Sequence, residues 1–320
     1  MRKIAVLTSG GDSPGMNAAV RAVVRTAVHL RLEVTGVRRG YAGLMEGDFL
    51  PLPTTAVSGI INRGGTILLT ARSEPFKTPA GQEQAVRQLQ QAGIEGLVVI
   101  GGDGSFHGAH ELYHDWHVPT VGVPASIDND LAGTDLSIGF DTAVNTALES
   151  IDRIRDTAVS HDRIFVVEVM GRESGMLALY AGVAGGAEVI LIPEVPTQIT
   201  QVGTLIKEGI ARGKRSYIIV VAEGAARGIA VAADIEAITG AETRATVLGH
   251  VQRGGSPSMQ DRVLASRLGA EAAHLLAQDR GGLMIGVQGD QVVASPLETA
   301  WTEKKPIDLS LYQMAQVLAT

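Results

Sequence analysis

The residues best suited to chemistry lie where an apolar run ends in glycines and an acid. Leu97–Ile100 predicts a strand buried on both faces, followed by Gly101-Gly102-Asp103-Gly104-Ser105 and a helix from Phe106 to about Asp115. Glycines at such a strand end let backbone N–H groups approach a phosphate, and the next helix points its positive end there. Asp103 could hold the magnesium ion that accompanies a nucleoside triphosphate. The structural alternative is a tight turn with Asp103 as helix N-cap.

A second glycine-rich turn follows the apolar run 4–7. Its sequence, Thr8-Ser9-Gly10-Gly11-Asp12-Ser13-Pro14-Gly15, opens a helix-period segment. This fits a phosphate-binding loop in which Gly11 permits close backbone approach, although a plain loop stays open as an alternative. Neither the dinucleotide fingerprint G-x-G-x-x-G nor a Walker P-loop occurs here.

Two carboxylates follow a third predicted strand, 120–123. Asp128 and Asp130 lie two residues apart in Ser126-Ile127-Asp128-Asn129-Asp130. One carboxylate could accept a proton from an attacking hydroxyl, and the other could help to order a metal, as phosphoryl transfer requires. An Asx-turn is the alternative. Since parallel strands end at one sheet edge, we expect this turn to lie near Asp103.

Three arginines lie in or after stretches suited to anionic ligands. Arg72 follows the run 67–71, Arg172 lies in Gly171-Arg172-Glu173-Ser174-Gly175, and Arg253 stands between His250 and a glycine pair. Arginine matches phosphate oxygens bidentately, whereas a solvated surface arginine is the alternative at any one position.

The elements that must position these residues alternate between strands and helices. Apolar runs predict strands at 4–7, 96–100, 120–123, 164–169, 189–192, 217–222 and, more weakly, 283–287. Helical periodicity predicts helices at 16–30, 82–92, 142–157, 176–184, 200–212, 231–239 and 262–277. The alternation predicts an α/β protein with two doubly wound, Rossmann-like, three-layer domains and mostly parallel sheets. We expect the domain boundary near residues 138–140.

Composition narrows the function classes. The chain has 320 residues, 45% hydrophobic, and a formal net charge of −7, so its overall field does not attract nucleic acid or anionic membrane. It has no cysteine, which excludes disulfides and thiolate chemistry. No apolar run is long enough to span a bilayer, and no signal peptide precedes the first strand. We expect a soluble, cytoplasmic protein without membrane or nucleic-acid partners.

In combination, these stretches resemble the bacterial ATP-dependent 6-phosphofructokinases. GGDSPGMN, GGDGS, IDND, GFDTA, EVMGR and LGHVQRGGSP occur in that family's order along nearly the whole chain. The resemblance implies transfer of the γ-phosphoryl of Mg-ATP to the 1-hydroxyl of fructose 6-phosphate, giving fructose 1,6-bisphosphate and ADP. It also implies that residues 1–138 with about 252–305 form a larger, ATP-binding domain. Residues 139–251 with about 306–320 would form a smaller, fructose 6-phosphate-binding domain.

The resemblance assigns roles to individual residues. Asp128 resembles the general base, Asp130 its supporting acid, and Arg172 and Arg72 the arginines that assist transfer, while Asp103 resembles the Mg²⁺ ligand. Residues similar to the ATP site are Gly11, Arg72, Ser73, Gly102, Asp103, Gly104 and Ser105. Residues similar to the sugar-phosphate site are Ser126, Ile127, Asp128, Arg163, Met170, Gly171, Arg172, Glu223, Arg244, His250 and Arg253.

The resemblance further implies a homo-oligomer, expected to be a tetramer, whose active sites are shared between subunits. Arg163 and Arg244 resemble the pair that reaches the 6-phosphate from a neighbouring subunit. A second, inter-subunit site would bind ADP or phosphoenolpyruvate through Arg21, Arg25, Arg155, Gly186, Ala187, Glu188, Arg212, Lys214, Arg215 and Ser216. Gly59 departs from the family, where aspartate is common at this position.

Three rival functions remain at this point. A pyrophosphate-dependent phosphofructokinase would carry aspartate at position 104 and lysine at position 125, where this chain has Gly104 and Ala125. An NAD or lipid kinase would share GGDG but would not need the stretch 250–255. A non-catalytic nucleotide sensor would be expected to lack a base such as Asp128.

Overall fold

The structure is a computed structural model that describes residues 1–319, and the chain forms two compact units. The first comprises Met1–Ile127, Leu131–Thr142 and Arg253–Lys305. The second comprises Asp128–Asp130, Ala143–Gln252 and the C-terminal residues from Pro306 onward. Each unit is therefore built from separate stretches of the chain. Asp128–Asp130 follows a strand of the first unit in sequence but groups with the second.

A seven-stranded sheet forms the centre of the first unit, in the order β11-β10-β5-β4-β1-β2-β3. The five inner strands pair in parallel, whereas the edge strands β3 and β11 pair antiparallel with their neighbours. Its strands are β1 (Lys3–Thr8), β2 (Glu33–Val37), β3 (Phe49–Pro51), β4 (Gly96–Gly101), β5 (Thr120–Pro124), β10 (Leu283–Gln288) and β11 (Gln291–Pro296).

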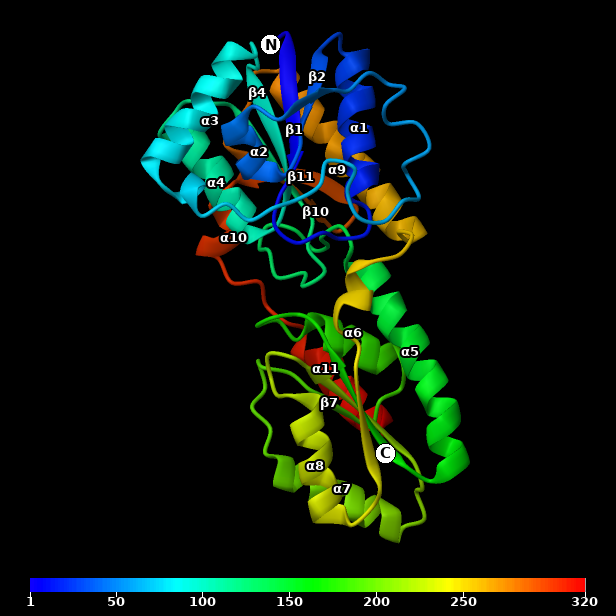
Figure 1. Ribbon diagram of the computed structural model, residues 1–320. Coiled ribbons are helices and arrows are strands. Elements are labelled where there is room, and N and C mark those ends of the chain that lie inside the picture. Colours follow the sequence, from blue (N-terminus) through cyan, green and yellow to red (C-terminus); the bar gives the residue numbers. More distant parts are fainter. Residues whose placement is uncertain (320) are drawn as a thin grey trace. The chain divides into compact units, whose positions relative to one another are not determined.

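Helices cover both faces of this sheet (Figure 1). Helices α1 and α9 pack against each other over one face, where small residues such as Ala19, Ala22 and Gly269 bring the two backbones close. The other face carries α2, α3 and α4. The helices of this unit are α1 (Met16–His29), α2 (Gly40–Glu46), α3 (Pro79–Gln91), α4 (Asp103–His114), α9 (Met259–Ala277) and α10 (Thr299–Thr302), with a 3₁₀ turn η1 (Pro75–Lys77).

The second unit is built on a four-stranded sheet in the order β7-β8-β6-β9, and all its pairs are parallel. Its strands are β6 (Ile164–Val169), β7 (Val189–Leu191), β8 (Tyr217–Ala222) and β9 (Thr243–Val247). Helices α7 and α8 bury their apolar residues against one face of these strands. The helices assigned to this unit are α5 (Phe140–His161, whose first turn belongs to the first unit), α6 (Met176–Ala184), α7 (Ile199–Ala211), α8 (Gly228–Thr239) and α11 (Leu309–Leu318), with a 3₁₀ segment η2 (Gly249–Arg253).

The architecture confirms the predicted fold class, with helices on both faces of mostly parallel sheets. Doubly buried strands are the reason the prediction worked, because β4 and β8 are buried at every residue. The segment 33–51 was not predicted, and it forms β2, α2 and β3. Gly36 weakens the strand pattern of β2, because glycine is depleted in strands.

Candidate active site

Three loops of the first unit meet at one edge of its sheet, because they follow three neighbouring parallel strands. The register pairs Thr8 of β1 with Ile100 of β4, and Gly101 with Pro124 of β5. Two backbone hydrogen bonds extend the pairing beyond the strands, from Ser9 N to Ile100 O at 3.0 Å and from Ala125 N to Gly101 O at 2.9 Å. The expected convergence of both glycine-rich turns with the Ser126 loop is therefore observed.

Glycine is required where these loops approach each other most closely. A Cβ atom at Gly101 would lie 2.6 Å from the carbonyl oxygen of Ser9, and Gly10 adopts a φ of +84°, a left-handed conformation. Helix α4 starts directly after this point with Gly102 as its N-cap, and no side chain caps its first turn. The N–H groups of Ser105 and Phe106 donate to the Gly102 carbonyl, which leaves those of Asp103 and Gly104 available to an anion.

Asp103 is the first residue of α4 and not its N-cap, so the structural alternative weighed for it is not realised. Its Oδ1 atom is buried and accepts no hydrogen bond from the residues that the structure describes. The Nε2 atom of His107, one helical turn later, lies 3.4 Å from this oxygen. A buried carboxylate oxygen without a donor fits a divalent cation, because hard cations prefer such oxygens.

Gly104 and Ser105 continue this first turn in different ways. Gly104 is exposed, and a Cβ atom placed there would meet nothing within 4 Å. Ser105 is buried, and its carbonyl accepts a hydrogen bond of 2.5 Å from the Tyr41 hydroxyl. Position 104 therefore has room for a side chain, whereas Ser105 anchors the turn to α2.

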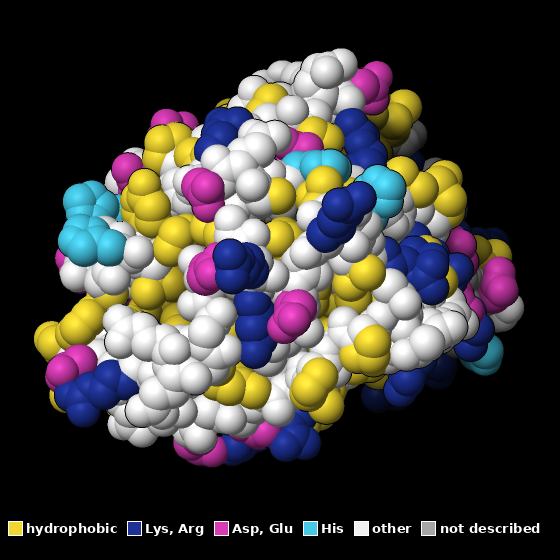
Figure 2. All heavy atoms as spheres, turned by 90° about the horizontal axis from the view of Figure 1, so that it is seen from above, with side chains coloured by type: hydrophobic (Ala, Val, Ile, Leu, Met, Phe, Trp, Pro, Cys, Tyr) yellow, Lys and Arg dark blue, Asp and Glu magenta, His cyan; other side chains and the backbone are white. Residues whose placement is uncertain are grey.

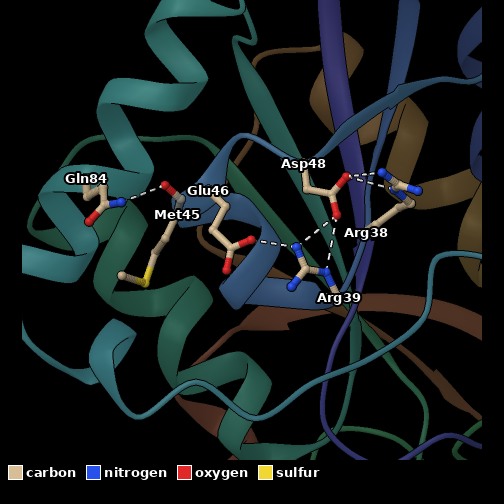
Figure 3. Close-up of polar contacts among 6 residues, drawn as sticks. All are labelled: Arg38, Arg39, Met45, Glu46, Asp48 and Gln84. Carbon is tan, nitrogen blue, oxygen red and sulfur yellow. Dashed lines mark hydrogen bonds and ion pairs between the residues drawn. The ribbon is translucent and has the colours of Figure 1, made fainter.

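A charged network holds α2 in place beside these loops (Figure 3). Asp48 accepts hydrogen bonds from the Nε atoms of Arg38, at 2.8 Å, and of Arg39, at 3.2 Å, and Arg39 also bonds Glu46 at 2.6 Å. The bond from Arg38 is the main reason that the pKa of Asp48 is lowered. Nothing in the sequence pattern had indicated this support.

Helix α2 also contacts the segment that carries two predicted ATP-site residues. Ser73 donates to the Met45 sulfur at 3.7 Å and accepts from the Phe76 N–H at 3.4 Å, so its hydroxyl lies at the start of η1. The Phe76 ring stacks on Tyr41 with 4.0 Å between centroids. Arg72 precedes this anchored segment and is exposed. Its guanidinium is therefore accessible to a ligand.

Arg253 lies beside the glycine-rich turn that contains Gly11, within the first unit. Its Nη1 atom donates to the carbonyl of Asp12 at 3.1 Å, and any side chain at Gly11 would collide with the guanidinium. Ser126 and Ile127 also belong to this unit, and Ile127 is fully buried. His250 belongs to the second unit, where it is exposed in η2. The structure thus distributes the predicted sugar-phosphate residues over both units.

In the second unit, a buried carboxylate meets an arginine. The Asp128 side chain is 3% exposed, and its Oδ2 atom lies 3.4 Å from the Nε atom of Arg172. The Arg172 guanidinium is itself 57% exposed, so one edge faces Asp128 while the remainder is accessible. Asp130, two residues on, is exposed. Two of the predicted catalytic residues are therefore in direct contact.

Glu223 and Gln252 fix the loop that carries Arg172. One carboxylate oxygen of Glu223 accepts from the N–H groups of Gly171, at 3.1 Å, and Arg172, at 2.8 Å. The fully buried amide of Gln252 accepts from the N–H of Met170 at 3.0 Å. Arg172 has a φ of +52°, a strained conformation for this residue type that these bonds hold in place. Sequence reasoning had missed Gln252, although it lies inside the quoted LGHVQRGGSP motif.

Arg163 and Arg244 lie close together near the N-terminal ends of β6 and β9. The loop that carries Arg172 follows the C-terminal end of β6. Both donate to one carboxylate, that of Glu242, with Nε···O distances of 2.8 and 2.9 Å. The bond from Arg244, followed by the weaker contribution of Arg163, lowers the pKa of Glu242. Pairing through the Nε edges leaves the outer ends of both guanidiniums available to an anion. Glu242 was also missed, since the sequence gives no sign that one carboxylate joins both arginines.

The predicted effector residues of the second unit gather around Glu188, the first residue before β7. Its carboxylate lies 3.4 Å from Lys214 Nζ and 3.8 Å from Arg155 Nη1, and Arg155 also donates to the carbonyls of Gly185 and Gly186. Ala187 lies between Gly186 and Glu188 in the sequence. Arg215 pairs instead with Asp162, at 3.5 Å, and Ser216 precedes β8. Arg21 and Arg25 lie one turn apart on α1 of the first unit.

The family model described as Phosphofructokinase matches residues 3–276. The chain belongs to the phosphofructokinase family. The ATP-dependent 6-phosphofructokinase of Halalkalibacterium halodurans is 55% identical to it over 319 residues, covering 100% of both chains. This confirms the family predicted from the motifs.

Two solved structures resemble the fold. The phosphofructokinase of Saccharomyces cerevisiae superposes with a TM-score of 0.89 at 38% identity, covering 100% of this chain and 48% of that longer one. A pyrophosphate-dependent phosphofructokinase from Marinobacter aquaeolei gives a TM-score of 0.86 at 23% identity, covering 97% of this chain and 86% of that one. The second likeness concerns the fold alone. Among the described residues, no helix is both long and apolar enough to cross a membrane.

Proposed function

We propose that the chain is an ATP-dependent 6-phosphofructokinase that transfers the γ-phosphoryl group of ATP to the 1-hydroxyl of fructose 6-phosphate. The contact that carries this proposal is the one between buried Asp128 and exposed Arg172, 3.4 Å apart. A base held beside a cation that can still reach a ligand is what phosphoryl transfer to a hydroxyl needs. The full-length relative from Halalkalibacterium halodurans, named for this activity, supports the proposal.

In the proposed reaction, Asp128 removes the proton of the sugar 1-hydroxyl as its oxygen attacks the γ-phosphorus. The bond from that phosphorus to the bridging oxygen of ADP breaks, and ADP leaves with the electron pair. Arg172 balances the charge on the phosphoryl oxygens, and the loop bonds from Glu223 keep this arginine in place. Catalysis consequently depends on positioning and electrostatic stabilisation.

ATP would be held by the loops at the sheet edge of the first unit. The uncapped first turn of α4 would bind phosphate oxygens, with Gly11, Arg72 and Ser73 around it. Asp103 fits a Mg²⁺ ion, because its Oδ1 atom accepts no hydrogen bond from the described residues. When bound, that ion would neutralise phosphate charge. Arg163 and Arg244 would bind the 6-phosphate of a neighbouring subunit's substrate, in a cytoplasmic homotetramer.

Pyrophosphate is the less favoured phosphoryl donor because of Gly104. A carboxylate at this position would repel and crowd the α-phosphate of ATP, whereas glycine leaves space. An NAD or lipid kinase would leave the stretch 250–255 unexplained, and a nucleotide sensor would not need Asp128. A coupled assay that offers ATP or pyrophosphate with a panel of sugar phosphates tests the proposal. Turnover with pyrophosphate, or none with fructose 6-phosphate, would contradict it.

Gly104→Asp is expected to damage the use of ATP far more than the binding of fructose 6-phosphate. The new carboxylate would stand at the helix start near the α-phosphate, while the sugar residues stay unchanged. Because a side chain at position 104 meets nothing within 4 Å, the fold should be retained. Kinetics with each substrate varied in turn measure the effect, and Gly104→Asn, similar in shape but uncharged, separates charge from size. An unchanged KM for ATP together with unchanged turnover would refute the proposed nucleotide position.

Regulation by effectors is expected to be weaker than in relatives that have aspartate at position 59. An aspartate there could organise the basic effector residues, and Gly59 has no side chain for this task. Gly59 has a φ of +68° and open space around its Cβ position, and aspartate tolerates this conformation better than most residues. Titration of phosphoenolpyruvate or ADP at subsaturating fructose 6-phosphate, for the native chain and Gly59→Asp, measures the difference. Strong inhibition of the native chain by micromolar phosphoenolpyruvate would contradict this prediction.

A further inference from the structure

A cavity of about 880 Å³ lies within the second unit, beside the edge strand β7. Its walls come from β7, α7, the start of β8 and α11, and buried Ile190, Val202 and Ala315 contribute to them. This volume lies in the range of small-molecule binding sites. None of the catalytic residues proposed above lines it. The cavity therefore needs an explanation that phosphoryl transfer does not supply.

The cavity walls present hydrocarbon even where their residues carry hydroxyl groups. The Tyr217 hydroxyl donates to the carbonyl of Ile206 at 3.3 Å, and the Tyr312 hydroxyl donates to the carbonyl of Ile190, also at 3.3 Å. Because these donors are already used, the two tyrosine hydroxyls have no donor left for an anionic ligand. A ligand inside the cavity would gain mainly from burying apolar surface.

The charged residues that line the cavity lie directly before β7 and directly after α7. Glu188, with a side chain only 11% exposed, is matched by Lys214 at 3.4 Å and accepts from the Ile218 N–H at 2.6 Å. Arg212 differs, since its side chain is 73% exposed and its carboxylate partner, Glu208, lies at 4.0 Å. Such an exposed and distant pair contributes little. Arg212 is consequently the cationic group of the lining that is most available to an anion.

We propose that this cavity binds an aliphatic carboxylate, with the hydrocarbon chain against the apolar wall and the carboxylate on Arg212. The chemistry differs from that of the expected effectors, because ADP and phosphoenolpyruvate have no aliphatic chain to bury. The two sites share Ala187, Glu188, Arg212 and Lys214, whereas Val202 and Ala315 belong to this one alone. The proposal goes beyond phosphoryl transfer and does not depend on it.

Calorimetric titration of the full chain with hexanoate, octanoate and decanoate, below their micellar concentrations and without nucleotide, tests the proposal. One site per chain is expected, with affinity rising about fourfold for each methylene group added. Decanol should bind more weakly than decanoate, and decyltrimethylammonium more weakly still. Absence of decanoate binding, or affinity independent of chain length, would overturn the proposal.

Two pairs of variants locate the site. Leu205→Trp, at a half-exposed lining position, should abolish decanoate binding, whereas Leu309→Trp, equally exposed on α11 but outside the lining, should not. Gln201→Trp provides a second filling variant if the first fails to fold. Arg212→Gln should weaken decanoate binding at least tenfold and leave decanol binding unchanged, while Arg153→Gln, another arginine paired four residues away in its helix, should change neither.

Three results would contradict the proposal that the carboxylate binds in this cavity. Decanoate binding that survives both filling variants would place the ligand elsewhere. Equal weakening of decanoate and decanol by Arg212→Gln would show that this arginine acts on the structure and not on the carboxylate. A change in oligomeric state with Leu205→Trp, in a chain that does not bind decanoate, would identify the cavity as a contact between subunits.

Discussion

Asp128→Asn is expected to lower kcat about 10²- to 10⁴-fold, the range usual for loss of a general base. The amide keeps the shape of the side chain but cannot accept the hydroxyl proton. KM for fructose 6-phosphate should change much less, because the sugar phosphate is held mainly by other residues. Steady-state kinetics with both substrates measure the two effects separately.

Folding must be monitored in this experiment, because Asp128 is buried and faces Arg172. Asp234→Asn, the same substitution at an exposed position on α8, is the control for activity and should retain full turnover. Thermal unfolding of both variants shows whether a loss of kcat reflects lost structure. A folded Asp128→Asn variant that turns over at a near-native rate would exclude Asp128 as the base.

The parts of the site that the sequence predicted are those governed by local rules. Strand ends follow from apolar runs, and neighbouring parallel strands bring their loops to one edge, which is how the turns at Gly11 and Asp103 came together. The N-cap alternative for Asp103 failed because the helix starts one residue earlier than the capping pattern suggests. A shift of one residue lies within the usual uncertainty of helix ends.

The parts that were missed depend on contacts between residues distant in sequence. Glu242 joins Arg163 and Arg244 only because β6 and β9 are neighbours in the sheet, an order that the chain sequence does not contain. Gln252 supports Met170 across 82 positions. The bonds that hold α2 lie closer together, yet they occur in a segment whose weak periodicity concealed the helix. Figure 2 shows basic side chains interspersed with acidic ones on the face it displays.

Arg163→Ser and Arg244→Ser are each expected to weaken fructose 6-phosphate binding about 10- to 150-fold while leaving the affinity for ATP nearly intact. Each change removes a charge-assisted contact to phosphate, worth about 1.5–3 kcal/mol. Binding and kinetic titrations with each substrate measure the effect. Arg227→Ser, an exposed arginine before α8 that is outside the proposed sites, serves as the control.

Strand geometry explains why these arginines should act on a neighbouring subunit's substrate. Arg163 precedes β6 and Arg172 follows it, and a strand rises about 3.3 Å per residue, so the six residues of β6 separate the two by roughly 20 Å along the strand. One small sugar phosphate could hardly contact both within the same subunit. Arg244 stands in the same relation to His250, at the two ends of β9. If two subunits share each active site, the residues at one end of a strand can contact the substrate of their own subunit and those at the other end the substrate of the neighbour.

Hybrid oligomers distinguish sharing from a purely internal site. Subunits with Arg244→Ser and subunits with Asp128→Ser are each expected to be nearly inactive alone at low fructose 6-phosphate. After dissociation and reassociation, some sites of a mixed oligomer combine an intact Asp128 from one chain with an intact Arg244 from the other. Activity should then recover in part. Mixing has to be shown independently, for example with a charge tag that separates hybrids by ion exchange. Proven hybrids without any recovery, or a fully active monomer in sedimentation, would refute the shared site, since an internal site never combines residues of two chains.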